Sequence, residues 1–335
     1  MSHCYHPLKA IDFGIADPVT GKHSIKVLKG EYSADEVCSV PGAKFIPLPC
    51  GRCIGCRLKY SRDWADRCML ESLQYKNNIF LTLTYDDNHI PECQEGSPVH
   101  PLRKRDLQLF IKRLRKEFPN DRIRYFACGE YGSNSMRPHY HLLVFNIPLG
   151  DLVFHHRDIN NGNLYYTSPT IDRCWYPESD SNLPPDKRSI NGFHLISDVN
   201  WDTCAYTARY IMKKQKGKNA DIYEKFNFPP EFTIMSRKPG IAADFYNKHN
   251  DIVINPYYLP TKDGHKTIRS NRYFDKLFDI EYPNDLEFIK EERVRIAQAN
   301  EDMKANLTTL SYKERLAAEE ENKIASTKIL KRKEL

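Results

Sequence analysis

The chain has 335 residues, of which 40% are apolar and 28% charged, and it contains 16 Phe and 20 Tyr. This length allows about two domains, and the aromatic content excludes a wholly disordered chain. No run of about 18 apolar residues is present, which excludes a membrane-spanning helix, and the N-terminus lacks the apolar stretch of a secretory signal, so secretion is not expected.

The positive charge is concentrated in two short segments, although the net charge of the chain is only +6. Residues 99–126 hold nine Lys and Arg against three Asp and Glu, and residues 209–218 hold five basic residues and no acidic one. The stretch from Asn284 to the end holds eleven residues of each sign. Clustered positive charge favours a polyanionic partner such as nucleic acid; solvated helix faces are the alternative explanation.

The first elements can be predicted from periodicity. Residues 1–50 predict an irregular N-terminal arm with a short strand at 24–28, because Pro and Gly interrupt a sparse pattern. Apolar residues at helical spacing predict a helix over 57–76. The apolar, β-branched run at 79–85 predicts a strand.

The clearest helix is expected over 103–118, because one face carries an apolar stripe and the opposite face is basic. The stripe consists of Leu107, Phe110, Ile111, Leu114 and Phe118. The basic face carries Lys112, Arg113, Arg115 and Lys116. Two strands are expected next, at 123–128 and 139–145, with a turn-rich loop between them.

The second half of the chain gives weaker signals. Residues 148–190 are rich in Pro, Asn, Asp and Ser, which predicts a long inserted loop or a small subdomain. A short strand is expected at 193–199, followed by a helix over 201–216 with Asn200 or Asp202 near its cap. The charged stretch from 284 predicts one or two long exposed helices.

Two histidines stand one residue apart in the predicted strand at 139–145. His139 and His141 therefore point to the same face, and two imidazoles at this spacing can bind one divalent cation. Glu130 ends the preceding predicted strand, and a hairpin would bring its carboxylate to the same ion. This mixed donor set suits Mg²⁺ or Mn²⁺ in a phosphate-handling site. An incidental histidine pair and a surface glutamate are the alternative.

Two tyrosines stand four residues apart in the predicted helix over 201–216. Tyr206 and Tyr210 therefore share one helix face, and Lys213 lies about one turn further on. A phenol can attack a phosphodiester and form a phosphotyrosyl link, and a nearby ammonium group would favour the phenolate. Ordinary packing of a tyrosine pair is the alternative.

Ten cysteines without a secretory signal favour reduced thiols or metal ligands over disulfides. Cys50, Cys53 and Cys56 form one run that supplies three thiolates, whereas a structural Zn²⁺ usually takes four ligands. Cys4, Cys38 or His6 would complete the set. Three buried thiols that pack the start of the first helix are the alternative.

Together these blocks resemble the HUH endonucleases, which nick single-stranded DNA to start rolling-circle replication. The histidine block of that family is similar to Pro138-His139-Tyr140-His141-Leu142. Its upstream block is similar to Phe80-Leu81-Thr82-Leu83-Thr84-Tyr85, and its tyrosine block to Tyr206-x-x-x-Tyr210-x-x-Lys213. All three occur in the order that the family has.

The resemblance extends to the replication initiation proteins of microviruses, especially the gokushovirus group. Their N-terminal signature resembles Pro49-Cys50-Gly51-Arg52-Cys53-Ile54-Gly55-Cys56-Arg57 followed by Arg62-Asp63-Trp64-Ala65. A second stretch resembles Arg124-Tyr125-Phe126-Ala127-Cys128-Gly129-Glu130-Tyr131-Gly132. The matching motifs run from residue 49 to residue 215.

The resemblance implies a replication initiator that nicks single-stranded viral origin DNA, forms a 5′-phosphotyrosine link and rejoins strands at termination. It implies Tyr206 and Tyr210 as nucleophiles, Lys213 as their helper, and His139, His141 and Glu130 as ligands of Mg²⁺ or Mn²⁺. The implied partners are single-stranded and replicative-form viral DNA, a host helicase and a host DNA polymerase, without a membrane, in the cytoplasm of an infected bacterium.

The resemblance also implies an α+β fold, namely an RRM-like nuclease domain whose central antiparallel sheet carries the histidine strand and is flanked by helices. The expected parts are an N-terminal arm with the cysteines over 1–56, the nuclease domain over 57–250 and a C-terminal extension over 251–335. The basic helices would flank the DNA groove, with Tyr85 or Tyr131 stacking on unpaired bases. The expected DNA contacts are Lys112, Arg113, Arg115, Lys116, Arg137, Arg209 and Lys214.

Three other functions compete with this interpretation. A zinc-containing DNA-binding regulator without enzymatic activity would leave the histidine pair incidental. A plasmid relaxase or a transposase of the HUH class would use the same residues. A histidine-triad hydrolase would need a third histidine at position 143, where Leu143 stands.

Overall fold

The computed structural model describes residues 4–16, 23–28, 44–133, 135–159, 162–210, 220–261 and 264–329. Contacts within the chain divide it into two compact units. The sheet unit is Ser61–Arg295, and the terminal unit joins Met1–Tyr60 to Ile296–Leu335. The terminal unit thus combines the expected N-terminal arm with the end of the expected C-terminal extension, while the three-part division itself stays a prediction.

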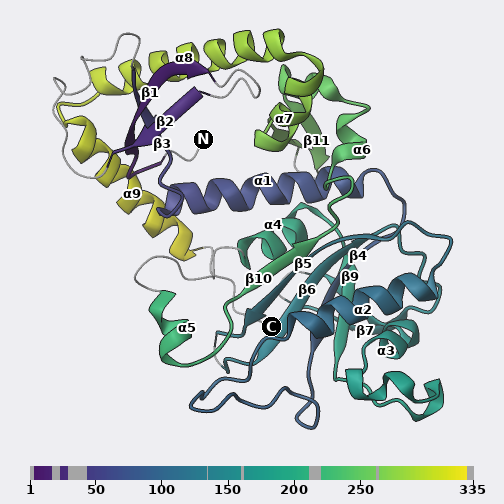
Figure 1. Ribbon diagram of the computed structural model, residues 1–335. Coiled ribbons are helices and arrows are strands. Elements are labelled where there is room, and N and C mark those ends of the chain that lie inside the picture. The colour runs from purple at the N-terminus through teal and green to yellow at the C-terminus, as the bar shows by residue number, and fades with distance from the viewer. Residues whose placement is uncertain are drawn as a thin grey trace. The chain divides into compact units, whose positions relative to one another are not determined.

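A seven-stranded antiparallel sheet forms the centre of the sheet unit (Figure 1). Its spatial order is β10-β5-β6-β4-β9-β8-β7. The strands are β4 (Asn78–Thr84), β5 (Arg124–Tyr131), β6 (Pro138–Phe145), β7 (Val153–Arg157), β8 (Leu164–Thr167), β9 (His194–Asp198) and β10 (Phe232–Met235). The predictions of β4, β5, β6 and β9 are confirmed, and the histidine strand β6 is an interior strand with β5 and β4 as neighbours.

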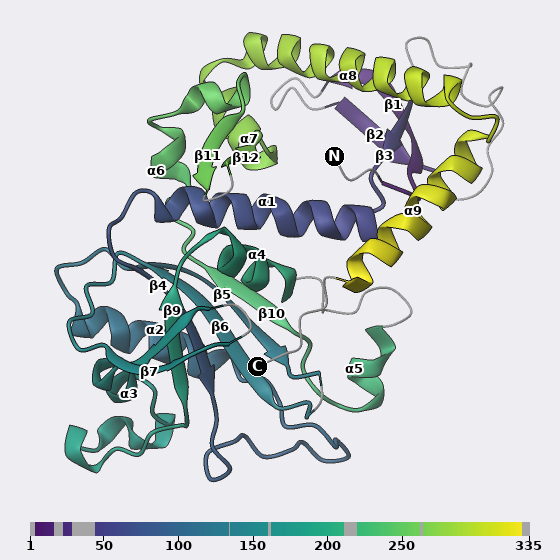
Figure 2. The ribbon, with the colours of Figure 1, turned by 180° about the vertical axis from the view of Figure 1, so that it is seen from behind.

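Alternating side chains give this sheet two different faces. The core face packs against α2 (Lys104–Glu117) and α3 (Pro169–Cys174). The site face packs against α4 (Trp201–Arg209) and against the part of α1 (Ile54–Ser72) that belongs to the sheet unit. α2 and α4 accordingly lie on opposite sides of the sheet (Figure 1 and Figure 2).

The apolar stripe of α2 explains why this helix closes the core face. Leu107, Phe110, Ile111 and Leu114 are buried against the sheet, as predicted. Each such side chain contributes about 1.5–3 kcal/mol of hydrophobic free energy on burial. α2 is therefore a major element of the core.

The start of α4 is fixed by a reciprocal cap at Asn200, as expected. The Asn200 side chain accepts a hydrogen bond from the backbone N–H of Thr203 at 2.9 Å, and the Thr203 hydroxyl accepts one from the backbone N–H of Asn200 at 2.9 Å. This capping box orients the helix that carries Tyr206. The helix was expected to run to residue 216, but residues 211–219 lie outside the described part of the chain.

A second apolar cluster joins the inner end of α1 to the elements that follow β10. The elements that complete this half of the chain are α5 (Asp221–Lys225), α6 (Ala243–Tyr246), β11 (Tyr257–Thr261), β12 (Gly264–Ile268), α7 (Arg272–Glu281) and α8 (Pro283–Asn306). A buried ion pair between Glu71 of α1 and Arg124 of β5 fixes the junction. Glu71 also accepts the backbone N–H of Ala242 at 2.6 Å, and Arg124 donates to the carbonyl of Gly240 at 2.9 Å.

Residues 148–190 are not simply a long loop or a separate subdomain. They supply β7 and β8, which extend the large sheet beyond β9, and α3, which packs into the core face. β7 and β8 are only five and four residues long. Strands this short carry too few alternations to stand out among Pro and Asp residues, which is why the pattern predicted a loop.

The terminal unit contains a three-stranded antiparallel sheet in the order β2-β1-β3. Its strands are β1 (Leu8–Ala16), β2 (His23–Val27) and β3 (Lys44–Leu48). The N-terminal arm is therefore more regular than expected, although the strand near 24–28 is confirmed. α9 (Tyr312–Ile329) completes the unit. Within the described segments, no helix has the length and apolarity needed to span a bilayer.

Candidate functional site

The histidine pair lies on the site face of β6. In the ladder, Glu130 of β5 is directly opposite His139, and Thr82 of β4 is directly opposite His141. Directly opposed residues of an antiparallel pair project to the same face with neighbouring Cβ atoms. The hairpin expected between the Glu130 strand and the histidine strand is thus present.

His141 is the most contacted side chain of the group. Its Nε2 lies 3.0 Å from Oε1 of Glu130, and its Nδ1 lies 3.1 Å from the hydroxyl of Thr82. Both His141 and Glu130 are buried. These contacts fix the orientation of the imidazole, which is the arrangement that metal-binding histidines usually have.

His139 is held by its own backbone turn. Its Nδ1–H donates to the carbonyl of Arg137 at 2.8 Å, so Nε2 is the nitrogen with a free lone pair. Burial lowers the pKa of His139, which keeps the imidazole neutral. A Cβ at Gly132 would come within 3.1 Å of the His139 ring, so glycine at this position leaves room for the ring.

The three expected metal ligands do not form a closed cluster in this conformation. Among the described residues, the only group of three or more His, Cys, Asp or Glu whose ligand atoms all lie within 4.8 Å is a set of four cysteines. His141 and Glu130 are in contact, whereas His139 is adjacent in register only.

Both tyrosines of α4 pack on the histidine site. The ring of Tyr210 stacks on that of His141 with centroids 4.6 Å apart, and the ring of Tyr206 meets the same imidazole edge-on at 5.4 Å. The two tyrosine rings are themselves 4.8 Å apart. The structure therefore brings together two parts of the sequence more than 60 residues apart.

The two tyrosines differ in their surroundings. Tyr210 is buried, and burial, with Tyr206 and Glu130 nearby, raises its pKa. Tyr206 is only half-buried. Lys213, expected to assist them, and Lys214, expected to contact DNA, lie outside the described residues.

The basic residues of α2 do not flank the histidine groove as expected. α2 covers the core face, so its outer surface faces away from the histidines. Arg113 donates to the carbonyl of Tyr176 and Arg115 to that of Ile123, whereas Lys112 and Lys116 are exposed. The physical reason is the apolar stripe of α2, which must cover the apolar face of the sheet. As DNA contacts, the four residues stay a prediction.

Arg137 and Arg209 lie nearer to the site. Arg137, in the β5–β6 turn, donates to Asp87 at 2.7 Å and to the carbonyl of Tyr85 at 3.0 Å. Arg209 is on α4, one residue before Tyr210, and donates to the carbonyl of Ala205 at 3.3 Å. Both sit beside residues of the site and are half-buried.

The aromatic residues expected to stack on bases are buried instead. Tyr85 and Tyr131 are each 3% exposed and pack in the core-face cluster. Tyr85 donates to Asp106 at 2.7 Å and Tyr131 to the carbonyl of Pro229 at 2.8 Å. The expectation for these two was wrong, because both project from strand ends to the core face rather than to solvent.

The exposed aromatic residue on this part of the sheet is Phe193, which the sequence analysis did not single out. It is 73% exposed. Its carbonyl accepts the backbone N–H of Thr84 at 2.9 Å, which places it opposite Thr84 on the site-face side of the ladder. Phe193 stands just outside the β9 pattern, so alternation alone predicted an ordinary strand residue.

A second set of reactive side chains lies in the terminal unit. Cys4 joins Cys50, Cys53 and Cys56, and all four Sγ atoms lie within 4.8 Å of one another. This set could bind a metal such as zinc. Of the fourth ligands expected from the sequence, the structure places Cys4 in the group. His6 instead contacts Glu320 at 2.6 Å, and Cys38 lies outside the described residues.

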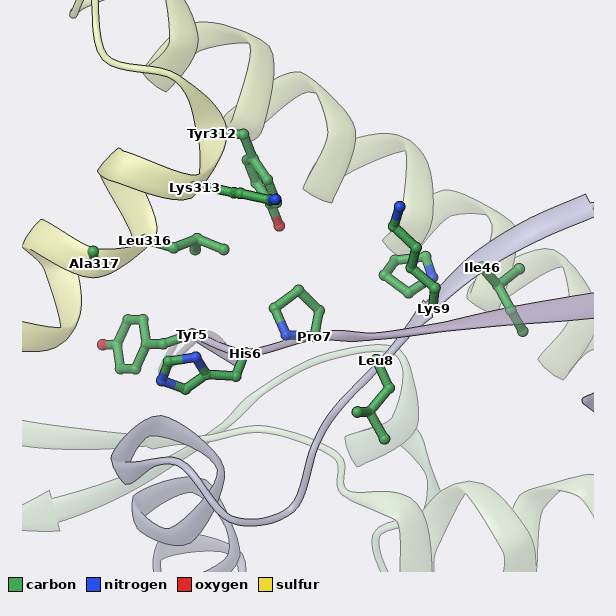
Figure 3. Close-up of a pocket in the computed structure, with 11 residues that line it drawn as sticks. Tyr5, His6, Pro7, Leu8, Lys9, Ile46, Tyr312, Lys313, Leu316 and Ala317 are labelled. Carbon is green, nitrogen blue, oxygen red and sulfur yellow. The ribbon is translucent and has the colours of Figure 1, made fainter. Parts of the chain in front are cut away.

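A pocket of about 890 Å³ lies in the same unit between the beginning of β1 and α9 (Figure 3). Tyr5, His6 and Leu8 line it on one side and Tyr312 and Leu316 on the other. None of the expected catalytic residues lines it.

Comparison with known proteins gives a consistent result. A family model described as replication-associated protein, of the ORF2 type, matches residues 78–215. This range contains the histidine strand, Glu130, α4 and both tyrosines. No solved structure matches the chain significantly.

Three curated relatives carry similar names. The replication-associated protein ORF2 of Spiroplasma virus 4 is 32% identical over 323 residues, which are 95% of this chain and 93% of the relative. The replication-associated protein VP4 of Bdellovibrio phage phiMH2K is 33% identical over 78% of this chain and 73% of the relative. The replication-associated protein ORF4 of Chlamydia phage 1 is 33% identical over 30% of this chain and 24% of the relative.

Proposed function

The chain belongs to the family of phage replication-associated proteins, and from this premise we propose that it initiates rolling-circle replication by nicking single-stranded viral DNA at the origin. The nucleophile is a tyrosine of α4, and the product carries a 5′-phosphotyrosine link. The fold in this proposal is the RRM-like sheet of the HUH endonucleases.

The observation that carries the proposal is the packing of two tyrosines on a histidine–glutamate pair. Tyr206 and Tyr210 both contact the ring of His141, and His141 contacts Glu130. A non-enzymatic DNA-binding protein has no need to bury these groups together. A phosphotransferase needs a nucleophile beside groups that stabilise charge on phosphate.

The donor set fits a divalent cation. His141 Nε2 and Glu130 Oε1 are 3.0 Å apart, which is about the separation of neighbouring ligands around an octahedral ion with bonds of ~2.1 Å. The lone pair of His139 Nε2 is available on the same face. We assign His139, His141 and Glu130 as the ligands of Mg²⁺ or Mn²⁺, which when bound would polarise a phosphate oxygen.

The chemistry is a transesterification. The phenolic oxygen attacks the phosphorus, the bond from phosphorus to the 3′ oxygen breaks, and the 3′ oxygen leaves as a hydroxyl after taking up a proton. One phosphodiester bond is exchanged for another, so the reverse reaction rejoins strands without a nucleotide cofactor. The free 3′-OH then serves a host DNA polymerase as primer, behind a host helicase.

The two tyrosines have different roles in this proposal. Tyr206, which is half-buried, makes the first attack because its hydroxyl can reach substrate without unpacking the site. Tyr210 is buried and stacked on His141, so it positions the imidazole first and accepts the second strand when the origin is regenerated. Lys213 assists the phenolate or the leaving oxygen.

The DNA strand crosses the site-face end of β6 and β4. Phe193 supplies an exposed ring there on which an unpaired base can stack, and Arg137 and Arg209 supply positive charge beside the scissile phosphate. Lys214 and the exposed lysines of α2 contribute to a weaker, sequence-independent attraction.

The test is a covalent adduct on a denaturing gel. Purified protein is mixed with a labelled single-stranded origin fragment of the viral genome and with Mn²⁺, Mg²⁺ or EDTA. We expect a slowly migrating protein–DNA adduct with either ion and none with EDTA. His139→Ala is expected to abolish it.

The matched control is Tyr258→Phe, which removes an exposed phenol on β11. It should form as much adduct as the natural protein. Tight DNA binding by a folded protein without any adduct would instead support the regulator alternative. An adduct that forms equally in EDTA would reject the metal assignment while keeping the tyrosine chemistry.

A further inference from the structure

The four cysteines of the terminal unit are arranged as a tetrahedral site. Their sulfur atoms lie within 4.8 Å of one another, and Sγ of Cys4 is 4.0 Å from Sγ of Cys53. Zinc–sulfur bonds of ~2.3 Å place tetrahedral ligands ~3.8 Å apart. A disulfide would need sulfur atoms at ~2.05 Å, and these cysteines are free thiols.

Backbone amides point at the same sulfur atoms. Sγ of Cys50 accepts the N–H groups of Arg52 at 3.4 Å and of Cys53 at 3.3 Å. Sγ of Cys4 accepts the N–H of Cys50 at 3.2 Å. Four thiols that only fill space have no reason to collect backbone donors, whereas thiolates bound to a metal are stabilised by them.

One glycine makes this turn feasible. Gly51 has φ +71°, in the left-handed region that other residues rarely adopt. This conformation lets the chain reverse after Cys50, so that the next two amides face back to its sulfur. The backbone of residues 50–53 is thus shaped around Sγ of Cys50.

We propose that Cys4, Cys50, Cys53 and Cys56 bind one structural Zn²⁺ ion, and that this ion fastens the N-terminal segment and α9 to the beginning of α1. The site goes beyond the nicking activity and does not depend on it. Cys4 is supplied from a segment 46 residues before the other three, so the ion closes a large loop of chain.

The terminal unit needs such a fastening because its apolar clusters are small. Among the described residues, one cluster has only Tyr5, Cys53 and Leu316 as buried members, and the other has two. Small cores of this kind usually depend on a metal or disulfides for stability. The ion would hold Cys53 and, through Cys4, its neighbour Tyr5.

α9 contacts this arrangement directly. Leu316 of α9 packs with Tyr5 and Cys53, and His6 contacts Glu320 of α9. Tyr5 and Leu316 also form opposite walls of the pocket in Figure 3. Loss of the ion should therefore release α9 and open this pocket.

The first experiment measures metal content. The full-length protein is purified without chelator and analysed by plasma mass spectrometry, with about one zinc ion per chain expected. Replacement by Co²⁺ should give intense thiolate-to-cobalt charge-transfer absorption. Zinc far below stoichiometry together with no cobalt absorption would overturn the proposal, and neither measurement involves DNA.

Variants locate the ion. Cys4→Ser and Cys53→Ser should each lower zinc content at least ~10-fold under dialysis against a competing chelator. Cys4→His should retain zinc, because three cysteines and one histidine form a common zinc site. The control is Cys93→Ser, which alters an exposed cysteine outside the group and should keep about one ion per chain.

A proteolysis experiment tests the fastening. Chelation should make α9 sensitive to limited proteolysis, while cleavage within the sheet unit stays unchanged, and added Zn²⁺ should restore protection. Zinc retained by both Cys4→Ser and Cys53→Ser would place the ion elsewhere and contradict the proposal. Protection of α9 that is unchanged by metal removal would reject the fastening role.

Discussion

The two faces of the large sheet differ in what they do, although they are built from the same strands. Along β6, Tyr140, Leu142 and Val144 are completely buried against the core face. The residues between them include His139 and His141, which face the tyrosines of α4. One strand therefore stabilises the fold with one set of alternate residues and carries the candidate chemistry with the other.

The covering helices differ in the same way. α2 has a long apolar stripe and seals the core face along its length. α4 is nine residues long and covers the site face with small residues, Ala205 and Ala208, next to its two tyrosines. The comparison teaches that stability and chemistry should be separable by the parity of a residue within its strand.

The largest effect is expected from removing both phenols on the site face. The double variant Tyr206→Phe with Tyr210→Phe should lower adduct formation by at least ~10³-fold, because no nucleophile remains. Its melting temperature should stay close to that of the natural protein, since both rings remain. Quantified denaturing gels and calorimetry measure the two effects.

The single variants order the two tyrosines. Tyr206→Phe should reduce the first nicking step more than Tyr210→Phe. Undiminished nicking by the double variant would remove both tyrosines from the mechanism.

The opposite outcome is expected on the core face. Leu142→Ala should lower the free energy of unfolding by about 2–5 kcal/mol, because it leaves a cavity beneath α2. Below its melting temperature the variant should still form the adduct. Chemical denaturation compared with His141→Ala, a neighbouring change on the site face, tests the separation; equal stability losses in the two variants would break it.

A smaller effect is expected at Phe193. Phe193→Ala should weaken single-stranded DNA binding by ~1–3 kcal/mol if one base stacks on the ring. Phe154→Ala is the matched control, because Phe154 is also exposed but is paired in register with Tyr166, which packs on the core face. Fluorescence anisotropy at fixed salt measures both affinities. Similar losses in the two variants would assign the effect to general surface properties.

The smallest effect is a pH dependence of stability at His194 on the core face. Its Nε2 accepts the backbone N–H of Ser168 at 2.8 Å, and its Nδ1 lies 2.9 Å from Asp172. Burial lowers the pKa of His194 below its usual value, even though Asp172 acts in the opposite sense.

The sign of this dependence follows from linkage. Below pH ~6.5, the usual pKa of histidine, the unfolded chain binds more protons at this position than the folded protein does. Stability should therefore fall as the pH drops from ~6.5 and should be constant for this group above it. His194→Gln should flatten the dependence measured by thermal unfolding between about pH 5 and 7, within the titration range of histidine. An unchanged slope in the variant would assign it to other groups.

Local sequence determined much of the sheet unit. The alternation in β4 and β6 and the stripe of α2 depend on neighbours along the chain, so they could be predicted from spacing alone. The same is true of His139 and His141, because a separation of two residues in a strand fixes a common face. The strand predictions and the cap at Asn200 are confirmed for this reason.

Other features depended on contacts between distant segments. Tyr85 and Tyr131 were expected to be exposed aromatics, yet the core face buries both. The short strands β7 and β8 exist because β9 offers an edge to pair with. No local pattern carries that information.

The sequence by itself determined which residues share a face: the histidine pair, the tyrosine pair and three of the four cysteines. Only the tertiary structure decided that the tyrosines stack on His141, that α2 turns its basic side away from the histidines, and that Cys4 joins Cys50, Cys53 and Cys56. The physical reason is range. Backbone periodicity fixes directions over a few residues, whereas the meeting of separate segments is set by which apolar faces must be buried together.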